Sequence, residues 1–409
     1  MDYEVIIIGA GPVGSTVAEM IGREGHKVLI LEEHSEIGSP IHCTGKLSVN
    51  AFKELKLEAK GIINEVKGAN FYSPNGQSFQ VERDDTQAYI LDRKIFDKKL
   101  AENAVKVGVK ILTEARAMKF IVTKEGVNVI FTHKGDIKKL KGRIIVGADG
   151  VNSIVARRGG LYSKNSSELR IGVQKEVFGI KNIQSRIVEL FFGRKYAPGF
   201  FAWIVPIGNG NARVGLAVRP HLGKNPKKYL DDFIMTHPLI KEKFEGCSFN
   251  RANAHIIPTG GTLHQTVSEG IIIVGDAAGQ IKSTTGGGIY YGMLCAKIAG
   301  KTISKSLEAS RKGVLSRNSL LEYQRLWKAR LNKEIKISSK LRAFLTSLTD
   351  GEINYLFKII IANPRIFEEI VAKGDMDWQS KIATKVLNTL LKTLIKRPMI
   401  LYKMGKNLR

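Results

Sequence analysis

The chain has 409 residues, which is enough for two or three domains, and its 43% apolar and 25% charged residues are typical of a folded globular protein. Lys and Arg exceed Asp and Glu by 64 to 38, and this excess of 26 positive charges favours an anionic partner: nucleic acid, a lipid headgroup or a phosphorylated substrate. Three scattered cysteines without a CxxC pair exclude a disulfide framework, a zinc ribbon and a cysteine-ligated iron–sulfur cluster, so we expect a cytoplasmic protein without a metal site.

The charge is unevenly distributed along the chain. Residues 301–409 contain 23 basic and 9 acidic residues, so more than half of the positive excess lies in the last quarter of the chain. The sequence has no run of about 18 apolar residues, and its first residues lack the basic region of a signal peptide. We therefore expect neither a membrane-spanning helix nor a cleaved leader.

The first 50 residues predict a βαβ unit. Short β-branched runs at 3–8 and 27–31 predict two strands, and the stretch at 13–24 predicts a helix between them. A glycine-rich turn separates the first strand from the helix. Two strands joined in this way are parallel neighbours in a sheet.

The turn at residues 9–14 reads GAGPVG and matches the GxGxxG dinucleotide fingerprint between a strand and a helix, the context that gives this motif meaning. Gly9 permits the turn, Gly11 lets the backbone approach a pyrophosphate, and Gly14 lets the helix pack on the strand. Glu32 follows the second strand, 21 residues after Gly11, where a carboxylate binds ribose hydroxyls. The alternative is a glycine-rich turn without a ligand, but the register of strand, helix and acid favours FAD or NAD.

The middle of the chain is rich in strands. Aromatic and β-branched runs at 186–192, 201–206 and 213–218 predict an antiparallel sheet. The sequence Gly-Asn-Gly-Asn at 208–211 predicts a hairpin between the last two of these strands.

Two more strands that end in tight glycine turns are predicted at 143–150 and 271–279, so the nucleotide domain is expected to be discontinuous, with the sheet domain inserted in it. The expected nucleotide domain comprises 1–50, 85–160 and 265–300. The expected substrate domain comprises 51–84 and 161–264, and a basic helical region follows at 301–409.

These later turns also indicate which dinucleotide is bound. Their sequences, GADG at 147–150 and GD at 275–276, resemble the second and third motifs of flavoproteins with two dinucleotide-binding domains, in the same order and separation. The resemblance implies FAD, with Asp276 at the ribitol, and with Gly288 and Ile289 close to the isoalloxazine ring. Asp276 by itself is equally compatible with capping a turn.

Three further segments carry a narrower resemblance. Residues 36–45 (EIGSPIHCTG) resemble a cysteine segment beside the flavin, residues 89–97 resemble a segment whose arginine lies by the flavin, and residues 197–206 (APGFFAWIVP) resemble a PxxYxWxFP box. The family with these three segments is that of the archaeal geranylgeranyl reductases. The resemblance covers roughly the first 300 residues. It implies further cofactor contacts at Cys43, Thr44, Arg93 and Ala117.

This resemblance implies an α/β fold: a Rossmann-like FAD-binding domain of the p-hydroxybenzoate hydroxylase type, an antiparallel-sheet substrate domain and a C-terminal helical region. It implies an FAD-dependent reductase that saturates isolated double bonds of geranylgeranyl chains, in particular those of digeranylgeranylglycerophospholipids in archaeal membrane lipid biosynthesis. The electron donor stays open between a ferredoxin, a deazaflavin and NAD(P)H. A prenylated phospholipid substrate also implies a peripheral protein on the inner face of the cell membrane.

The chemistry of such a reductase makes demands on the substrate pocket. An isolated alkene is not an electrophile, so hydride transfer to it needs a proton donor and a dry, aromatic-lined pocket. The predicted pocket consists of Phe192, Phe201, Trp203 and Pro206, with Phe191 and Phe200 beside them. Ordinary packing in the core of a sheet is the alternative for each aromatic residue. Phe201 replaces a tyrosine of the family box and Val205 replaces a phenylalanine, which favours a subgroup with a different prenyl substrate.

Cys43 is the predicted catalytic residue. The family resemblance implies that it lies against the isoalloxazine ring, where its thiol tunes the flavin or relays a proton. The alternative is a small buried apolar side chain without a chemical role. Cys247 and Cys295 have no partner in the sequence pattern and are expected to be structural.

Residues 381–396 predict a basic amphipathic helix. At about 100° per residue, Lys381, Lys385, Lys392 and Lys396 fall within one sector of about 60°, opposite an apolar face. The helix either packs this apolar face on the body of the protein or binds an anionic membrane surface. No helix-turn-helix, zinc finger or RNP-like motif supports nucleic acid as the partner.

Two other functions compete with the reductase. An FAD-dependent aromatic monooxygenase (hydroxylase) shares the fold and the glycine–aspartate motifs, and it consumes NAD(P)H and oxygen. A non-catalytic flavoprotein that docks on membranes through its tail is the second competitor. A quinone-linked dehydrogenase with a terminal iron–sulfur domain is excluded by the number of cysteines. The segment around Cys43 and the box around Trp203 favour the reductase.

Overall fold

The computed structural model describes residues 1–162, 169–310, 312–381 and 397–408. Its internal contacts divide the chain into two compact units, and each unit is assembled from three separate stretches of sequence. Unit 1 contains Met1–Ile41, Arg93–Glu168 and Pro258–Ile335. Unit 2 contains His42–Asp92, Leu169–Ile257 and Lys336–Arg409.

Unit 1 is built around a six-stranded sheet. The strands are, in spatial order, β19 (Val267–Ser268), β20 (Ile271–Ile273), β12 (Ile144–Gly147), β1 (Val5–Ile8), β2 (Val28–Leu31) and β8 (Lys110–Leu112). β19 is antiparallel to its neighbour, and the remaining pairs are parallel. Every residue of β1 and β2 is buried, as is typical of a parallel sheet that is covered on both faces.

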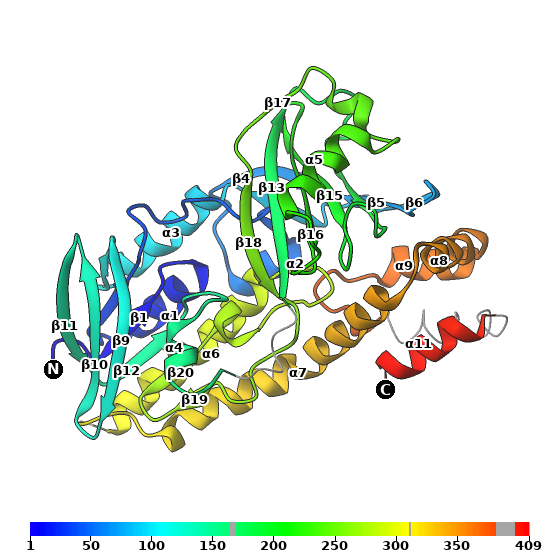
Figure 1. Cartoon of the computed structure of the whole chain (residues 1–409). Helices are drawn as coiled ribbons and strands as arrows, with labels where there is room; N and C mark the ends of the chain where they lie inside the picture. Colours follow the sequence, from blue (N-terminus) through cyan, green and yellow to red (C-terminus); the bar gives the residue numbers. More distant parts are fainter. Residues whose placement is uncertain (163–168, 311, 382–396, 409) are drawn as a thin grey trace. The chain divides into compact units, whose positions relative to one another are not determined.

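Helical segments lie between and after the strands of this sheet along the chain. They are α1 (Pro12–Arg23), α3 (Arg93–Lys106), α4 (Ile154–Arg158), the short 3-10 turn η3 (Gly275–Ala278) and α6 (Ile289–Ala309). Figure 1 shows α1 and α6 side by side, and their packing is close because Gly300 of α6 lies against Met20 of α1. A Cβ at position 300 would lie 2.5 Å from the Cβ of Met20.

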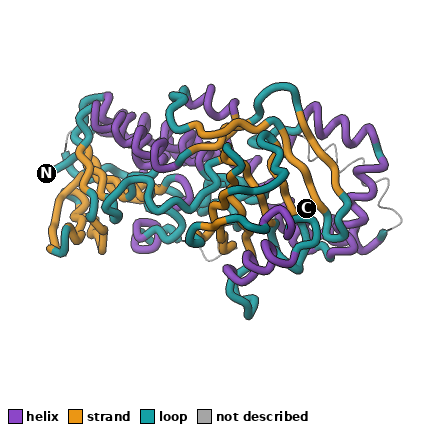
Figure 2. The backbone as a smooth tube through the Cα atoms, turned by 90° about the horizontal axis from the view of Figure 1, so that it is seen from above, coloured by secondary structure: helices purple, strands orange, loops and turns teal. Residues whose placement is uncertain are grey.

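A second sheet of unit 1 has three antiparallel strands, β9 (Ala115–Thr123), β10 (Gly126–His133) and β11 (Asp136–Gly142). Its inner face contributes Val127 and Phe131 to the buried core of the unit. The amides of Asp2 and Tyr3 donate hydrogen bonds to the carbonyl of Lys141 in β11. The N-terminus therefore lies beside this sheet, as Figures 1 and 2 show.

Unit 2 is built around a larger sheet. Its strands are, in order, β17 (Ser248–Phe249), β13 (Leu169–Phe178), β16 (Asn211–Val218), β15 (Ala202–Gly208), β14 (Ile187–Phe191), β5 (Gly68–Tyr72) and β6 (Ser78–Glu82), with β18 (Asn253–Pro258) paired to β13. The predicted hairpin joins β15 to β16, and its turn residues Asn209 and Gly210 both have positive φ, which favours asparagine and glycine there. Most pairs are antiparallel as predicted, but β14 and β5 are parallel.

Helices and a small sheet complete unit 2. The small sheet contains β3 (Lys46–Ser48), β7 (Ala88–Leu91) and β4 (Ile62–Val66). The remaining elements are α2 (Val49–Leu55), α5 (Pro226–Thr236), η2 (Lys241–Phe244), α8 (Asp350–Ala362), α9 (Pro364–Lys373), α11 (Pro398–Leu408) and the end of α7 (Arg317–Ser347). α5 packs on the large sheet through Leu230 and Phe233, and α8 and α11 pack with the end of α7 around a separate apolar cluster (Figure 1).

The predicted fold class is confirmed, whereas the observed boundaries differ from the expected ones. The expected separate region at 301–409 is divided, because α6 and the first part of α7 belong to unit 1. Residues 42–50 and 85–92, expected in the nucleotide domain, belong to unit 2, and the segment from Pro258 belongs to unit 1. The C-terminal region is divided because the first part of α7 packs on the sheet of unit 1. Its Tyr323 is buried and donates a hydrogen bond to the carbonyl of Ile273 in β20.

The predicted basic helix at 381–396 lies outside the described residues apart from Lys381. No helix within the described part of the chain combines the length and the apolar character that crossing a bilayer requires. The description of the C-terminal region therefore rests on α7, α8, α9 and α11.

Candidate functional site

The glycine-rich loop between β1 and α1 shows a different reason for each of its glycines. Gly9 has a φ of +100°, and a Cβ there would lie 2.5 Å from the carbonyl oxygen of Ala148. A Cβ on Gly14 would lie 1.9 Å from the carbonyl oxygen of Gly9, so helix and strand meet only without a side chain. A Cβ on Gly11 would meet nothing within 4 Å. Packing therefore requires Gly9 and Gly14, while Gly11 leaves open space at the start of α1.

The first turn of α1 presents its backbone amides to that space. Gly11 is the N-cap residue and no side chain caps the helix. Pro12 occupies the first helical position and has no amide hydrogen to satisfy. The amides of an uncapped first turn and the positive end of the helix dipole bind anionic groups such as a pyrophosphate.

Glu32 lies at the end of β2 and is only 8% exposed. Its Oε2 accepts a hydrogen bond from the amide of Ala10 at 2.8 Å, and its Oε1 accepts one from the amide of His34 at 3.0 Å. The carboxylate is therefore fixed against the glycine-rich loop. Its remaining lone pairs are available to accept hydrogen bonds from hydroxyl groups.

The glycine motifs that follow later in unit 1 pack against one side chain at the start of α1, that of Val13. A Cβ on Gly275 would lie 2.9 Å from Val13, and a Cβ on Gly292 would lie 2.6 Å from it. Gly288 is the uncapped N-cap of α6, and a Cβ there would lie 2.4 Å from Oδ1 of Asp276. The predicted cofactor residues Gly9, Gly11, Gly14, Glu32, Asp276, Gly288 and Ile289 therefore come from elements that converge within unit 1.

Asp149, in the middle motif, has a local structural role. Its Oδ1 accepts a hydrogen bond from the hydroxyl of Ser153 at 2.6 Å, and its Oδ2 accepts one from the amide of Ile154 at 2.7 Å. Burial raises the pKa of this carboxyl above its usual value. Asp149 thus stabilises the turn after β12.

Arg93 and Ala117, the other predicted cofactor residues of unit 1, lie on α3 and β9. The guanidinium of Arg93 forms a bidentate pair with Asp97, with distances of 2.9 Å and 2.7 Å. Ala117 is partly buried and packs against the core of the unit from the three-stranded sheet. Their contact with a cofactor stays a prediction.

Cys43 and Thr44 belong to unit 2, where a buried arginine fixes their loop. Arg213 of β16 is 2% exposed, and its Nη1 donates hydrogen bonds to the carbonyl oxygens of Thr44 and Leu91, both at 2.9 Å. Cys43 is partly exposed, and its Sγ accepts a hydrogen bond from the amide of Gly45 at 3.3 Å. The loop that carries the cysteine is therefore held by the Arg213 side chain and by the backbone amide of Gly45.

Three of the predicted pocket residues form one aromatic cluster in unit 2. The rings of Phe192 and Phe201 lie 5.9 Å apart, and those of Phe201 and Trp203 lie 6.0 Å apart. Phe200 stacks on Phe201 with ring centres 4.4 Å apart. The indole N–H of Trp203 donates to Oε1 of Gln174 at 3.2 Å, so the polar end of the ring is satisfied.

The fourth predicted pocket residue, Pro206, and the expected neighbour Phe191 lie on the opposite face of the sheet. Phe191 packs between Tyr72 and Phe233, with ring centres 4.5 Å and 5.3 Å away, and it belongs to the core under α5. Pro206 is an even-numbered residue of β15 and shares its face with Ile204 rather than with Trp203. Side chains alternate along a strand, so these two residues do not join the aromatic cluster.

The aromatic cluster borders an apolar cavity of about 200 Å³ within unit 2. Its walls come from β5, β6, the segment after β14, the end of α7, and α8. The lining residues are Phe71, Phe79, Phe192, Gly193, Arg194, Ala197, Gly199, Phe200, Arg342, Leu345, Thr346, Leu348, Ile353, Leu356, Phe357 and Ile360. Arg342 is 2% exposed, and its guanidinium carbon lies 4.0 Å from the ring centre of Phe200.

Comparison with known proteins agrees with this geometry. Residues 2–324 match a family described as FAD binding domain. The digeranylgeranylglycerophospholipid reductase of Methanocaldococcus jannaschii is 34% identical over 356 residues, which cover 87% of this chain and 89% of that protein. Digeranylgeranylglycerophospholipid reductase 2 of Methanothermobacter thermautotrophicus is 33% identical, over 88% of this chain and 91% of that one.

The chain belongs to the geranylgeranyl reductase family of FAD-binding proteins. A solved structure, described as a geranylgeranyl bacteriochlorophyll reductase-like protein of Thermoplasma acidophilum, matches this reductase-like flavoprotein with a TM-score of 0.84 at 25% identity, over 99% of this chain and 98% of that one. A flavin-dependent brominase with a TM-score of 0.72 and 19% identity, covering 97% of this chain and 100% of its own, shares the fold alone.

FAD is therefore the cofactor of this flavoprotein, and the residues of unit 1 fit it. The open space at Gly11, the uncapped amides of α1 and the anchored carboxylate of Glu32 suit a pyrophosphate and a ribose. Among the described residues, no three His, Cys, Asp or Glu side chains gather as a metal site would require.

Two kinds of candidate site residue were not predicted from the sequence. Arg213 carries one available signal, since it is a charged residue in a strand of otherwise small and apolar residues, NARVGLAV. The residues that line the cavity from β5, β6 and α8 have no such signal in the sequence, because Phe71, Phe79 and Phe357 lie far in sequence from the aromatic box.

Proposed function

We propose that this flavoprotein saturates isolated C=C bonds of geranylgeranyl chains and that its substrate is a digeranylgeranylglycerophospholipid. The relatives named for that activity support the lipid class. The aromatic cavity of unit 2 is the single observation that carries the proposal, because it can accommodate an apolar segment of the lipid within the fold. The family box differs at Phe201 and Val205, so the double bonds that are reduced first can differ from those of the relatives.

A prenyl chain suits the walls of the cavity. The chain has no hydrogen-bond donor or acceptor, and walls of phenylalanine, leucine and isoleucine require none. Each buried CH2 group contributes about 0.8 kcal/mol of binding free energy. Arg194 also lines the cavity and is exposed, which suits a phosphate at the end of the lipid.

The cofactor site supplies the reducing equivalents. Reduced FAD, when bound, is the source of hydride. Gly11 and the first amides of α1 bind the pyrophosphate, Glu32 accepts hydrogen bonds from the ribose, and Asp276 accepts them from the ribitol. Arg93 and Ala117 are further cofactor contacts in this proposal.

The alkene also needs a proton, and Cys43 is the proposed residue for it. The sulfur of Cys43 accepts the hydrogen bond from Gly45, so that bond does not use the thiol proton. Arg213 holds the adjacent carbonyl, which limits the movement of the thiol. We assign Cys43 as the catalytic residue that tunes the flavin or relays a proton, and Thr44 as a cofactor contact beside it.

The lipid substrate also determines the proposed surroundings of the protein. We propose a cytoplasmic flavoprotein that binds peripherally to the inner face of the cell membrane. Its electron donor is a ferredoxin, a deazaflavin or NAD(P)H. The large positive charge of the chain suits an anionic membrane surface.

Anaerobic re-oxidation of the reduced protein tests this function. The protein is reduced with dithionite, and flavin absorbance is followed after a detergent-solubilised digeranylgeranyl phospholipid is added. We expect the flavin to re-oxidise with lipid and to stay reduced with the saturated lipid. Re-oxidation that occurs only with oxygen and an aromatic substrate would contradict the proposal and support the monooxygenase instead.

A further inference from the structure

The C-terminal helix α11 is held to unit 2 by one of its faces. Ile400 and Met404 of α11 are buried in an apolar cluster with the end of α7 and with α8. Lys403 adds an ion pair, because its Nζ lies 2.6 Å from Oε2 of Glu352 in α8. The inner face of α11 is therefore occupied by the body of the protein.

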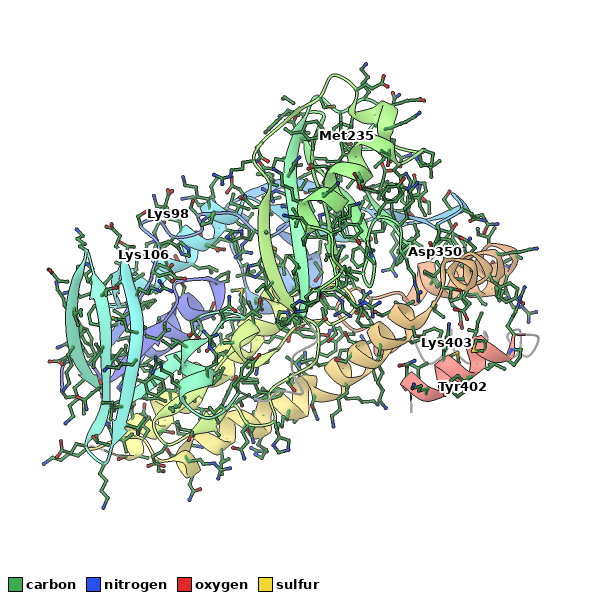
Figure 3. All side chains as sticks on the ribbon, viewed as in Figure 1. Lys98, Lys106, Met235, Asp350, Tyr402 and Lys403 are labelled. Atoms are coloured by element: carbon green, nitrogen blue, oxygen red, sulfur yellow. The ribbon has the colours of Figure 1, made fainter. Side chains whose placement is uncertain are left out.

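The opposite face of α11 presents large apolar side chains to solvent. Met399 is 61% exposed and Tyr402 is 64% exposed, and Lys406 is exposed on the same face. Positions 399, 402 and 406 follow the spacing i, i+3, i+7, which places them on one side of a helix. Figure 3 shows Tyr402 on α11 together with the neighbouring Lys403. We call Met399, Tyr402 and Lys406 the outer face of α11.

The charged residues of α11 itself are all basic, and one of them, Lys403, is paired with Glu352 of α8. The described residues 397–408 contain Arg397, Lys403 and Lys406 and no acidic residue. Exposed apolar and aromatic side chains among basic residues are the combination that binds the interface of an anionic bilayer.

We infer that the outer face of α11 docks the protein on an anionic lipid surface. The biological purpose of this docking rests on the proposed lipid substrate. Its test does not, because vesicle binding is measured without turnover. The position of α11 on α8 relates this docking to the substrate cavity. Leu356, Phe357 and Ile360 of α8 line the apolar cavity of unit 2, and Leu356 also belongs to the cluster that holds α11. A bilayer bound by the outer face of α11 thus lies on the far side of α11 from α8, whose residues line the cavity.

Vesicle co-sedimentation tests the docking face directly. The probes are vesicles of phosphatidylcholine with phosphatidylserine and vesicles of phosphatidylcholine alone. We expect the parent protein to bind the anionic vesicles, and to bind them more weakly as salt is added. The double variant Met399→Glu, Tyr402→Glu is expected to lower the partition coefficient about tenfold or more, and Lys406→Glu about fivefold.

Two control variants make the test specific. Met235→Glu changes a methionine of α5 that is 73% exposed and also lies in unit 2, and Ile137→Glu changes an isoleucine of β11 that is 71% exposed next to Lys138 and Lys139 (Met235 is labelled in Figure 3). Both controls are expected to bind as the parent does, and all variants are expected to keep parent FAD content and parent re-oxidation by detergent-solubilised lipid.

Four outcomes would overturn the inference. The first is equal binding of both vesicle types by the parent protein, and the second is unchanged binding by the α11 variants. The third is a loss of binding that is confined to Ile137→Glu. The fourth is that the α11 variants change the oligomeric state, measured by sedimentation velocity, and do not change vesicle binding. The last outcome would make the outer face an interface between copies of the chain. Failure of lipid re-oxidation with intact vesicle binding would contradict the proposed function and leave the docking face standing.

Discussion

The Nη1 of Arg213 donates a hydrogen bond to the carbonyl oxygen of Thr44 at 2.9 Å, and this bond ties the loop that carries Cys43 to the large sheet of unit 2. The same guanidinium binds the carbonyl of Leu91 and lies 3.0 Å from Oε1 of Glu176. A residue on β16 thus determines where a residue more than 160 positions earlier in the sequence is held.

The first prediction concerns this anchor. Arg213→Met removes the donor from three acceptors in or near the interior, and we expect it to lower the free energy of unfolding by about 2–3 kcal/mol, because hydrogen bonds to charged groups are among the stronger ones. Urea unfolding measures the change. The control is Arg186→Met, at an exposed arginine before β14, with an expected change of less than about 0.5 kcal/mol. Equal stability of the two variants would show that Arg213 is not an anchor.

The second prediction separates two glycines of one loop. Gly14→Ala places a methyl group against the carbonyl of Gly9, and we expect a loss of about 3 kcal/mol in the unfolding free energy of the FAD-free protein. Gly11→Ala meets open space, so we expect a loss of less than about 1 kcal/mol but FAD affinity at least about tenfold weaker. Unfolding curves and fluorescence titration with FAD measure both quantities. Parent affinity in Gly11→Ala would contradict the assignment of the pyrophosphate site.

The third prediction concerns the thiol. Cys43→Ala is expected to keep parent FAD content and to lower the rate of lipid-dependent re-oxidation about tenfold or more, because a positioned proton donor is lost. Cys247→Ala serves as the control, since Cys247 donates to the carbonyl of Gly179 at the edge of the sheet and has no assigned role in the reaction. Full turnover by Cys43→Ala would remove Cys43 from the mechanism.

The fourth prediction concerns pH. His237 is buried among Phe191, Tyr196 and Phe233, and burial, together with the nearby Lys195, lowers its pKa from 6.5 to about 4. A histidine with a lowered pKa in the folded state contributes stability that is present above pH 6.5 and is lost as the pH falls towards 4. The free energy of unfolding is therefore expected to decrease across this window.

His237→Phe is expected to flatten that decrease, because a phenylalanine keeps the aromatic packing and binds no proton. His264→Phe, at an exposed histidine, is the matched control and is expected to keep the parent pH dependence. Urea unfolding at several pH values across the window measures the slope. A parent slope in His237→Phe would show that other groups cause the loss of stability in acid.

The sequence predicted the nucleotide fold well because its signals are local. The loop from Gly9 to Gly14 and the carboxylate of Glu32 depend on short-range geometry: a strand, a tight turn and a helix in fixed register. The hairpin at Asn209 and Gly210 follows from the same kind of local requirement, since both positions have positive φ.

The substrate side was less predictable because it depends on distant segments. The alternation of a strand places Phe191 and Phe192 on opposite faces, but sequence alone does not tell which face α5 covers. Phe357 reaches the cavity from α8, more than 150 residues after the aromatic box. The predicted basic helix at 381–396 lies outside the described residues apart from Lys381.

The central claim is that this flavoprotein adds hydrogen to isolated prenyl double bonds. The most direct test is a single-turnover reaction under anaerobic conditions, in which the dithionite-reduced protein is mixed with digeranylgeranyl phospholipid and the extracted lipid is analysed by mass spectrometry. We predict that the lipid gains the mass of two hydrogen atoms for each flavin oxidised. A lipid of unchanged mass after the flavin has been oxidised, or no flavin oxidation at all, would contradict the account.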